Sequence, residues 1–422
     1  MTEQRPPAAN DFAAAPKQIP MPASPVKRLL ELAPFALFII VLPFPRTVAL
    51  RMLLLAVCFG IALWQWWRTP DARVPIPCKP ALLVWGSVCI ASLAYTGDLA
   101  YTLGELKNEI AYAMMAFFGF SVIAADRAAA IWLFRAVAAG LSFIGLWAAL
   151  AWAGNGYAWN EGGAFGGIGV FSTYLVTVVP VLIWLIHADP LSNMRRGATV
   201  LLLFAVFLAV ISMQRATWPT LAAQALIILT HVVRQRFPGV GWRGMAVAII
   251  GVSLIAGAGT QYIQQARFGS MVEQTALTDD VRLSFWPKAV TKIAEHPLVG
   301  TGFGRSMMRK TYPELVPKEV PDLWHAHNVV LNYGLQLGVP GIIAFLGLFA
   351  AFGHVFFKAI ARGDGWTGIT GLAIIVGVLL RNQFNDFFTR DMSLLFWVLI
   401  GTLARLAVAA RYEKPCDRPT RD

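Results

Sequence analysis

Residues 335–358 read LQLGVPGIIAFLGLFAAFGHVFFK, and this run decides the fold. It contains no acidic side chain, and its one basic side chain, Lys358, stands at its end. A helix needs about 20 mostly apolar residues to cross the hydrocarbon core of a bilayer. The run also lacks the alternation of apolar and polar residues that is typical of an outer-membrane barrel strand. We therefore predict a membrane-spanning helix here.

Similar runs recur along the whole chain. Of its 422 residues, 57% are hydrophobic and only 14% are charged, whereas a soluble globular protein is about 25% charged. The runs predict helical spans near residues 29–45, 48–67, 80–97, 108–125, 130–153, 169–187, 197–214, 216–234, 243–260, 335–358, 366–386 and 392–411. The predicted fold class is thus an all-α integral membrane protein with about 12 transmembrane helices. A long, partly helical external loop separates spans 9 and 10.

The basic residues indicate the orientation of the chain. Lys and Arg occur in every second gap between the predicted spans, which the positive-inside rule assigns to the cytoplasm. The residues in question are Arg68, Arg73, Lys79, Arg127, Arg195, Arg196, Arg234, Arg236, Arg243, Lys358, Arg362, Arg411, Lys414, Arg418 and Arg421. Both termini are then cytoplasmic. The net charge of +12 is thereby accounted for by topology, and we predict no binding of nucleic acid.

The same topology predicts the division of the chain. Residues 1–28 are rich in Pro and Ala and lack an apolar core like that of a signal peptide, so we expect a disordered cytoplasmic tail. A membrane domain follows over 29–411, with an external loop subdomain at 261–334, and 412–422 form a second cytoplasmic tail. None of the four cysteines falls in a predicted external loop, so no disulfide framework is implied.

The longest polar segment closes with Trp324-His325-Ala326-His327-Asn328, where the chain returns to the bilayer. Histidine is the side chain best suited to exchange a proton near neutral pH, and His327 is a candidate general base for a hydroxyl group. In a helix, positions two residues apart lie on different faces, so the two histidines need not act together. Packing within the loop is the alternative for both. The spacing of a His-Glu-x-x-His zinc site is absent, and we predict no metal.

Several arginines lie at the external ends of spans or in the long loop, where the positive-inside rule does not explain them. They are Arg215, Arg282, Arg305, Arg381 and Arg390. The planar guanidinium group matches phosphate oxygens in bidentate fashion. Snorkelling at helix ends is the alternative for any single one of them.

An aspartate and a glycine-rich stretch are further candidates for the same external region. Asp386 could orient a histidine, pair with an arginine or cap a helix, and it stands at a depth where polar residues often have functional roles. The glycines of residues 297–305 could bring backbone N–H groups to an anion. No Walker lysine follows them, so we expect no ATP site.

Motifs within residues 170–400 resemble those of the O-antigen ligase family, part of a wider superfamily of O-antigen ligases and polymerases. The motifs are Gln214 to Thr217, Arg282 to Trp286, Glu295 to Gly304, His325 to Asn328, Gly334 to Gly341, and Asn385-Asp386. Their order and their side of the membrane match the family. Gln214 and Thr217 depart from it, because relatives often have Ser near this arginine.

The resemblance implies a glycosyltransferase of the bacterial inner membrane that acts at the periplasmic face. It would move a glycan from undecaprenyl diphosphate to lipid A–core oligosaccharide, with inversion and without cofactor, metal or ATP. Arg215 and Arg282 match arginines thought to grip the diphosphate, and His327 matches the histidine proposed to deprotonate the acceptor hydroxyl. Contacts with the substrates are expected from His325, Arg305, Arg381, Asp386, Trp324 and Asn328. Membrane lipids are the other expected partners.

Three other functions remain open at this point. A polymerase of the same superfamily shares the diphosphate chemistry and differs in its acceptor, and a protein-glycosylating relative is a further transferase. A transporter or flippase of lipid-linked sugars belongs to another class. Transporters bind substrate near the midplane between related halves, whereas this chain has no visible repeat and gathers its polar groups at one face.

Overall fold

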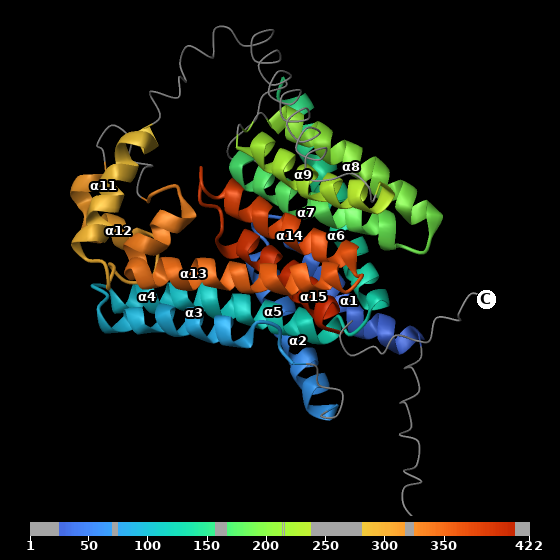
Figure 1. The fold of residues 1–422 in the computed structure, drawn as a ribbon, viewed down its shortest axis with the longest axis horizontal. Helices are drawn as coiled ribbons and strands as arrows, with labels where there is room; N and C mark the ends of the chain where they lie inside the picture. Colours follow the sequence, from blue (N-terminus) through green and yellow to red (C-terminus); the bar gives the residue numbers. More distant parts are fainter. Residues whose placement is uncertain are drawn as a thin grey trace, which may run out of the picture.

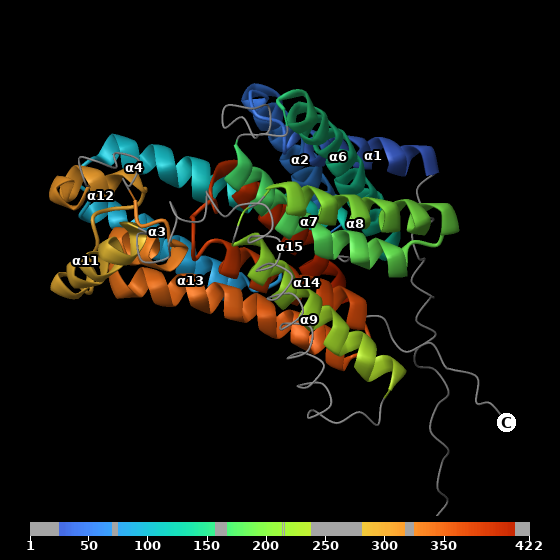
Figure 2. The same ribbon diagram turned by 90° about the horizontal axis from the view of Figure 1, so that it is seen from above.

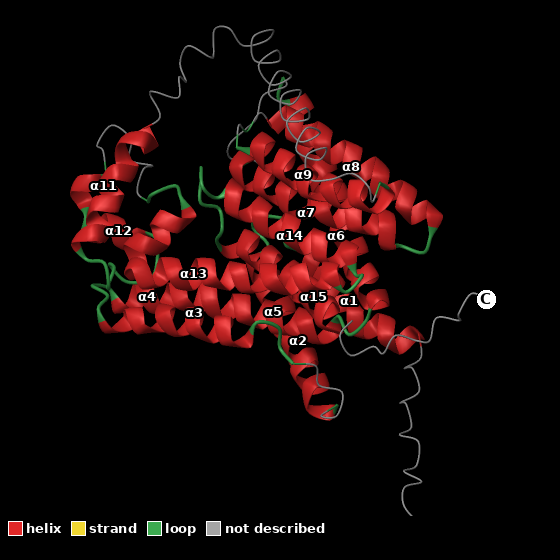
Figure 3. Ribbon diagram, in the orientation of Figure 1, coloured by secondary structure: helices red, strands yellow, loops and turns green. Residues whose placement is uncertain are grey.

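The computed structural model describes residues 25–69, 75–156, 167–212, 214, 216–237, 281–316 and 325–409. Within these residues every regular element is helical (Figure 3). The elements are α1 (Pro25–Val41), α2 (Val48–Arg68), α3 (Lys79–Ala91), η2 (Ser92–Ala94), α4 (Leu99–Glu105), η3 (Leu106–Ala111), α5 (Tyr112–Ile123), α6 (Arg127–Gly154), α7 (Ile168–Ala188), α8 (Ser192–Ser212), α9 (Thr217–Arg236), α11 (Val281–Glu295), α12 (Ser306–Thr311), η6 (Pro313–Leu315), α13 (Val329–Ala361), α14 (Gly365–Arg381) and α15 (Arg390–Ala409).

The all-helical prediction is confirmed, and the predicted spans coincide with helices wherever the chain is described. Among the described residues, six helices are long and apolar enough to cross a membrane, namely α2, α6, α7, α8, α13 and α15. The segment Lys79–Ala94 and α14 are shorter apolar helices. The span predicted at 243–260 lies outside the described residues, and the number of twelve spans stays a prediction.

Ion pairs show how the helices alternate in direction. Arg28 near the start of α1 pairs with Asp126, which caps the start of α6, so both helices begin at one end of the bundle. Arg51 near the start of α2 pairs with Asp391 in the first turn of α15, so these two begin at the opposite end. The segment before α13 also lies at this second end, because Val329 N–H donates to the carbonyl of Asn382 between α14 and α15 at 2.9 Å. We call it the histidine end.

The core is built on large aromatic side chains facing small residues. Trp397 of α15 lies within 6.0 Å, between ring centroids, of Trp85, Phe117 and Phe352 from three other helices. A Cβ atom on Gly401 would come within 2.8 Å of the Phe117 carbonyl oxygen, so α5 and α15 pack closely. Small residues at such contacts are typical of membrane helices, whose association depends on close packing. The resulting bundle holds the ends of its helices in fixed positions.

The long helix α13 is broken where it meets the external loop. Gly338 has φ +69°, a left-handed conformation that glycine adopts most readily, and Pro340 lacks a backbone N–H. The break leaves the carbonyls of Leu335 and Gln336 without helical donors, and Thr301 N–H and Gly302 N–H bond to them at 2.9 and 3.0 Å. The loop is therefore bonded into the helix. Figures 1 and 2 both show α11 and α12 at one end of the molecule, beside α3 and α4.

Candidate functional site

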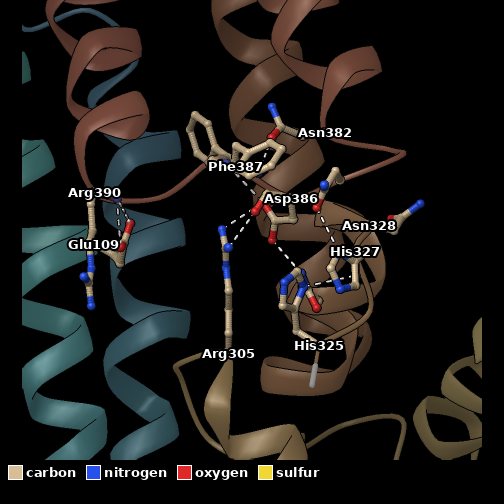
Figure 4. A network of polar contacts seen from close by, with 12 residues as sticks. Glu109, Arg305, His325, His327, Asn328, Asn382, Asp386, Phe387 and Arg390 are labelled. Carbon is tan, nitrogen blue, oxygen red and sulfur yellow. Dashed lines mark hydrogen bonds and ion pairs between the residues drawn. The ribbon is translucent and has the colours of Figure 1, made fainter. Parts of the chain in front are cut away.

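The segment that carries both histidines is fixed by the start of α13. Asn328 is the N-cap residue, and its Oδ1 accepts hydrogen bonds from Val330 N–H and Leu331 N–H, both at 3.0 Å. Its Nδ2 donates to Gln383 Oε1 at 3.0 Å. Asparagine is among the best N-cap residues. Here it also joins the histidine segment to the connection between α14 and α15, so its described contacts are structural ones (Figure 4).

The two histidine rings stack on each other. Their centroids are 3.9 Å apart with an interplanar angle of 25°. The expectation that the rings would face apart assumed a helix, but His327 has φ +49° and the segment turns sharply. The backbone N–H of His327 donates to His325 Nδ1 at 3.1 Å. His325 is buried, at 5% exposure, whereas His327 is partly exposed.

A side-chain amide sets the proton position on His327. The Nδ1 atom lies 2.8 Å from Asn385 Oδ1, which is an acceptor. With this amide orientation Nδ1 carries the hydrogen, and the neutral ring has its lone pair on Nε2. This is the tautomer that a general base needs when the second nitrogen faces the substrate. In the sequence Asn385 was noted only as part of the Asn385-Asp386 motif, and it is 58 positions away from His327 in the chain.

Asp386 connects the external loop to the histidine segment. Its carboxylate pairs with Arg305 Nη2 at 2.9 Å and accepts a hydrogen bond from Asn332 Nδ2 at 2.6 Å. Asn332 Oδ1 in turn accepts from Ala326 N–H at 2.9 Å, between the two histidines. The sequence left several roles open for Asp386, and the structure shows the one in which it pairs with an arginine. The analysis of the sequence missed Asn332, because the predicted span began at 335 and not at Val329.

Glu109 holds the start of α15 beside this network. Its Oε1 and Oε2 accept from the backbone N–H of Arg390 at 3.0 and 3.1 Å (Figure 4). A carboxylate at a helix N-terminus is favourable. Between Glu109, Glu105, Arg305 and Asp386 lies a cavity of about 20 Å³, which has room for about one water molecule. The cavity is too small for a molecule larger than about one water.

Only the neighbouring residues indicate where the predicted catalytic arginines lie. Arg215 and the side chain of Arg282 lie outside the described residues, as does Trp324. The backbone of Arg282 is one helical turn before Trp286, whose Nε1–H donates to the carbonyl of Ala326 at 2.9 Å. The first turn of α11 therefore lies close to the histidine segment.

The start of α9, next to Arg215, lies at the same end of the bundle. Gln224 of α9 donates to the carbonyl of Ala373 in α14 at 2.9 Å, and His231 further along α9 contacts Trp366 at the start of α14. The two helices are thus antiparallel. The first turn of α9 is consequently beside the last turn of α14, where Arg381 lies.

Arg381 is inside the bundle and not at its surface. It is 1% exposed, and its Nη2 donates to Ser172 Oγ at 2.8 Å and to the carbonyl of Gly169 at 3.2 Å. Its guanidinium carbon lies 5.3 Å from the ring centroid of Phe387. These contacts fix α14 to the start of α7. Contact between Arg381 and a substrate stays a prediction.

The glycine-rich stretch is used for packing. Thr301 N–H and Gly302 N–H bond to carbonyls of α13, Phe303 N–H bonds to Ser92 Oγ at 3.2 Å, and Gly304 N–H bonds to Gln336 Oε1 at 2.7 Å. Four successive donors are thus occupied inside the protein. The idea that these N–H groups bind an anion is wrong for this conformation.

The loop subdomain is also attached to α4. Lys310 of α12 pairs with Asp98, the N-cap residue of α4, and the hydrogen bond from Lys310 holds the pKa of Asp98 below its ordinary value of 3.8. Tyr101 Oη accepts from Ser306 N–H at 3.1 Å. In the described part of the chain, no three His, Cys, Asp or Glu side chains are close enough together to hold a metal ion.

Comparison with known proteins identifies one family. The family model described as O-antigen ligase matches residues 199–346. The matched region includes the later part of α8, then α9, α11, α12, both histidines and the first part of α13, and it ends before Asn385 and Asp386. No curated protein matches the chain.

Proposed function

We propose that this chain, which belongs to the O-antigen ligase family through residues 199–346, joins a lipid-linked glycan to lipid A–core oligosaccharide. The donor is a glycan on undecaprenyl diphosphate, and the reaction takes place at the periplasmic face of the bacterial inner membrane. The observation that carries the proposal is the contact between His327 Nδ1 and Asn385 Oδ1 at 2.8 Å. It supports a neutral imidazole whose Nε2 carries the lone pair and can accept a proton.

The reaction needs one base and a stabilised leaving group. His327 Nε2 removes the proton from a hydroxyl group of the acceptor sugar, and this oxygen attacks the anomeric carbon of the donor. The bond from that carbon to the diphosphate oxygen breaks, and undecaprenyl diphosphate leaves with the electron pair. Attack from the face opposite the leaving group inverts the configuration. The sugar–diphosphate bond supplies the energy, so the proposed reaction uses neither ATP nor metal.

Arg215 and Arg282 are proposed to bind the diphosphate. Fixed guanidinium groups stabilise the charge that develops on a leaving diphosphate, because they need no reorganisation during the reaction. The support is positional: α9 begins next to Arg215, and α11 begins beside Arg282, at the end of the bundle where the histidine segment lies. An apolar isoprenyl chain can remain in the lipid next to such a site.

The remaining predicted residues are proposed to act around this centre. Trp324 would stack on a sugar face. His325, Asn328, Arg305 and Asp386 have contacts that hold the segment of His327 in position. We propose that they act on the substrates mainly through that positioning.

The proposal is tested by transfer with purified protein, undecaprenyl-diphosphate glycan and lipid A–core, without ATP and with a chelator. His327→Ala should lower the transfer rate by about 100- to 10,000-fold, the usual contribution of a general base. His296→Ala is the matched control, because His296 lies in the same external region, is exposed and is outside the cluster. Elution as a monodisperse peak would show that each variant is folded.

The products separate the proposal from its alternatives. Glycan on lipid A–core supports the ligase, and glycan that only lengthens on its carrier would identify a polymerase. Movement of lipid-linked glycan across a vesicle without a covalent product would identify a transporter. Unchanged transfer in His327→Ala would remove the proposed base.

A further inference from the structure

A second cavity lies at the end of the bundle opposite the histidines. Arg405 is 15 residues beyond Arg390 in α15, and at 1.5 Å per residue this is about 22 Å along the helix. Here α1, α2, α5 and α15 enclose about 460 Å³. The lining includes Trp64, Trp66, Phe118, Arg68 and Arg405. The cavity is therefore both aromatic and basic.

The guanidinium group of Arg405 lacks a partner within the described protein. Its Nε atom is buried and has no hydrogen-bond acceptor, and no described carboxylate lies within ion-pair distance of the group. Glu31, which is the one carboxylate in the described lining, accepts a hydrogen bond from Gln65 Nε2 at 3.2 Å. Arg405 as a whole is partly exposed, but a charge that is partly withdrawn from water without a counterion is unfavourable. An anion that enters the cavity would supply what Arg405 lacks.

The second basic group at this site remains available at the rim. The guanidinium carbon of Arg68 lies 4.7 Å from the ring centroid of Trp64, and its side chain is exposed. Among the described residues, two arginines and one carboxylate line the cavity, so this part of the lining has a positive net charge. This charge favours an anionic group over a neutral or zwitterionic one.

An apolar groove continues from this cavity along the side of the bundle. It has a volume of about 470 Å³, is lined by Leu30, Gly60 and Ile61, and shares Glu31 and Trp64 with the basic cavity. A Cβ atom on Gly60 would meet no atom within 4 Å, so the groove is open at the middle of α2. A basic cavity that leads into an apolar groove matches an amphiphile with an anionic head and a hydrocarbon chain.

We propose that this site binds an anionic phospholipid, with its phosphate at Arg405 and one acyl chain in the groove at Gly60. Anionic lipids of the bilayer are attracted to basic residues at the membrane surface. A free phosphate ion would leave the apolar groove empty. The site is separate from the proposed transferase centre and does not depend on it.

Native mass spectrometry of the delipidated full-length protein tests the proposal. The probes are dioleoyl phosphatidylglycerol, dioleoyl phosphatidylcholine with the same chains, and sodium phosphate as a competitor. The wild-type protein should retain one phosphatidylglycerol at least fivefold more strongly than phosphatidylcholine, and millimolar phosphate should not displace it. Arg405→Gln should remove this preference. Gly60→Phe should block the groove and lower the occupancy of both lipids at this site.

The controls keep the result interpretable. Arg196→Gln removes a positive charge from an exposed position in α8 and should leave lipid retention unchanged. Gly60→Phe tests the same site from its apolar part, independently of whether Arg405→Gln folds. Equal retention of the two lipids by the wild-type protein would overturn the proposal. So would normal retention in Gly60→Phe, and displacement by phosphate would reduce the site to one for a small anion.

Discussion

The charged side chains that lie near the two ends of α15 differ in their ion-pair partners. At the histidine end, Asp386 bonds to Arg305 and Asn332, and Glu109 accepts the N–H of Arg390, so each charge has a partner within the protein. At the other end, Arg405 has a buried Nε without an acceptor and faces a cavity of about 460 Å³. The first arrangement fixes side-chain positions before any substrate arrives. The second leaves a charge to be neutralised by a ligand.

This difference separates two ways of building a site in a membrane protein. A reaction that depends on a correctly placed base gains from a preorganised surrounding, because nothing has to reorganise in the transition state. A lipid site only has to match charge and shape, and neighbouring lipid is always present. The comparison predicts that substitutions at the two ends have different consequences for stability and for transfer.

The largest effect on stability is expected from Asp386→Ala. The carboxylate is 4% exposed and the Arg305 side chain is 14% exposed, so the substitution leaves a largely buried guanidinium group without its counterion and with only its hydrogen bond to the backbone carbonyl of residue 386. Breaking such a pair costs about 3–5 kcal/mol of unfolding free energy. Arg405→Gln has no described partner to lose, so it should not lower the unfolding free energy of the delipidated protein. Denaturant titration in detergent measures both.

Asp386→Asn is the matched control for shape. It keeps the size of the side chain but removes the charge, so its cost should lie between those of the wild-type protein and Asp386→Ala. A loss in Arg405→Gln as large as that in Asp386→Ala would contradict the contrast between the two ends.

A smaller effect, on catalysis alone, is expected from Asn385→Ala. Without Oδ1 as an acceptor, the proton position and the angle of the His327 ring are no longer fixed. Misplacement of a catalytic group lowers rates by about 10- to 100-fold. Gly60→Phe, at the other end, should leave transfer unchanged. The measurement is the rate of transfer from the lipid-linked donor.

A pH profile distinguishes positioning from a general structural role. Asn385→Asp keeps an acceptor at Nδ1 but adds a negative charge, which favours the protonated imidazole. The acidic limb of the rate profile should then move to higher pH by roughly 1 unit. A profile in Asn385→Asp that coincides with that of the wild-type protein would argue against Asn385 as the residue that orients His327.

The helices could be predicted from the sequence, because a span is recognised by an uninterrupted apolar run. The start of α13 could not be predicted in this way. Asn328 and Asn332 make the first turn look like a loop, although one caps the helix and the other bonds to Asp386. The break at Gly338 depends on donors from residues 301 and 302, which are more than 30 positions away. The pattern of apolar residues along the chain does not indicate such long-range contacts.

The candidate site was predictable in its residue types but not in its geometry. The sequence placed the two histidines together at a water boundary, but it did not indicate the positive φ of His327 or the stacking of the two rings. Arg405 lies within a predicted span, and nothing in its neighbours along the chain indicates a cavity. That cavity is formed by α1, α2 and α5, which reach it from distant parts of the sequence.

The smallest effect is expected at the exposed edge of the histidine end, where Lys310 pairs with Asp98. Their side chains are 45% and 35% exposed, and exposed pairs contribute little to stability. The pair depresses the pKa of Asp98 below 3.8. Its contribution is thus fully present above the unfolded-state value and is lost as the pH falls through the lower pKa of the folded state. The wild-type protein should be slightly more stable than Lys310→Met near neutral pH, and the two should converge in acid below 3.8.

Thermal unfolding of both proteins across this pH range is the measurement. A difference that persists in acid would mean that the ion pair is not its source. The contact of Lys310 with the Tyr101 ring, 4.4 Å from Nζ to the ring centroid, would then hold α12 on α4, because the charge of lysine does not change in this range. A difference as large as that of Asp386→Ala would remove the distinction between buried and exposed pairs at this end. Convergence in acid would instead confine the strong coupling to Asp386 and the residues it contacts.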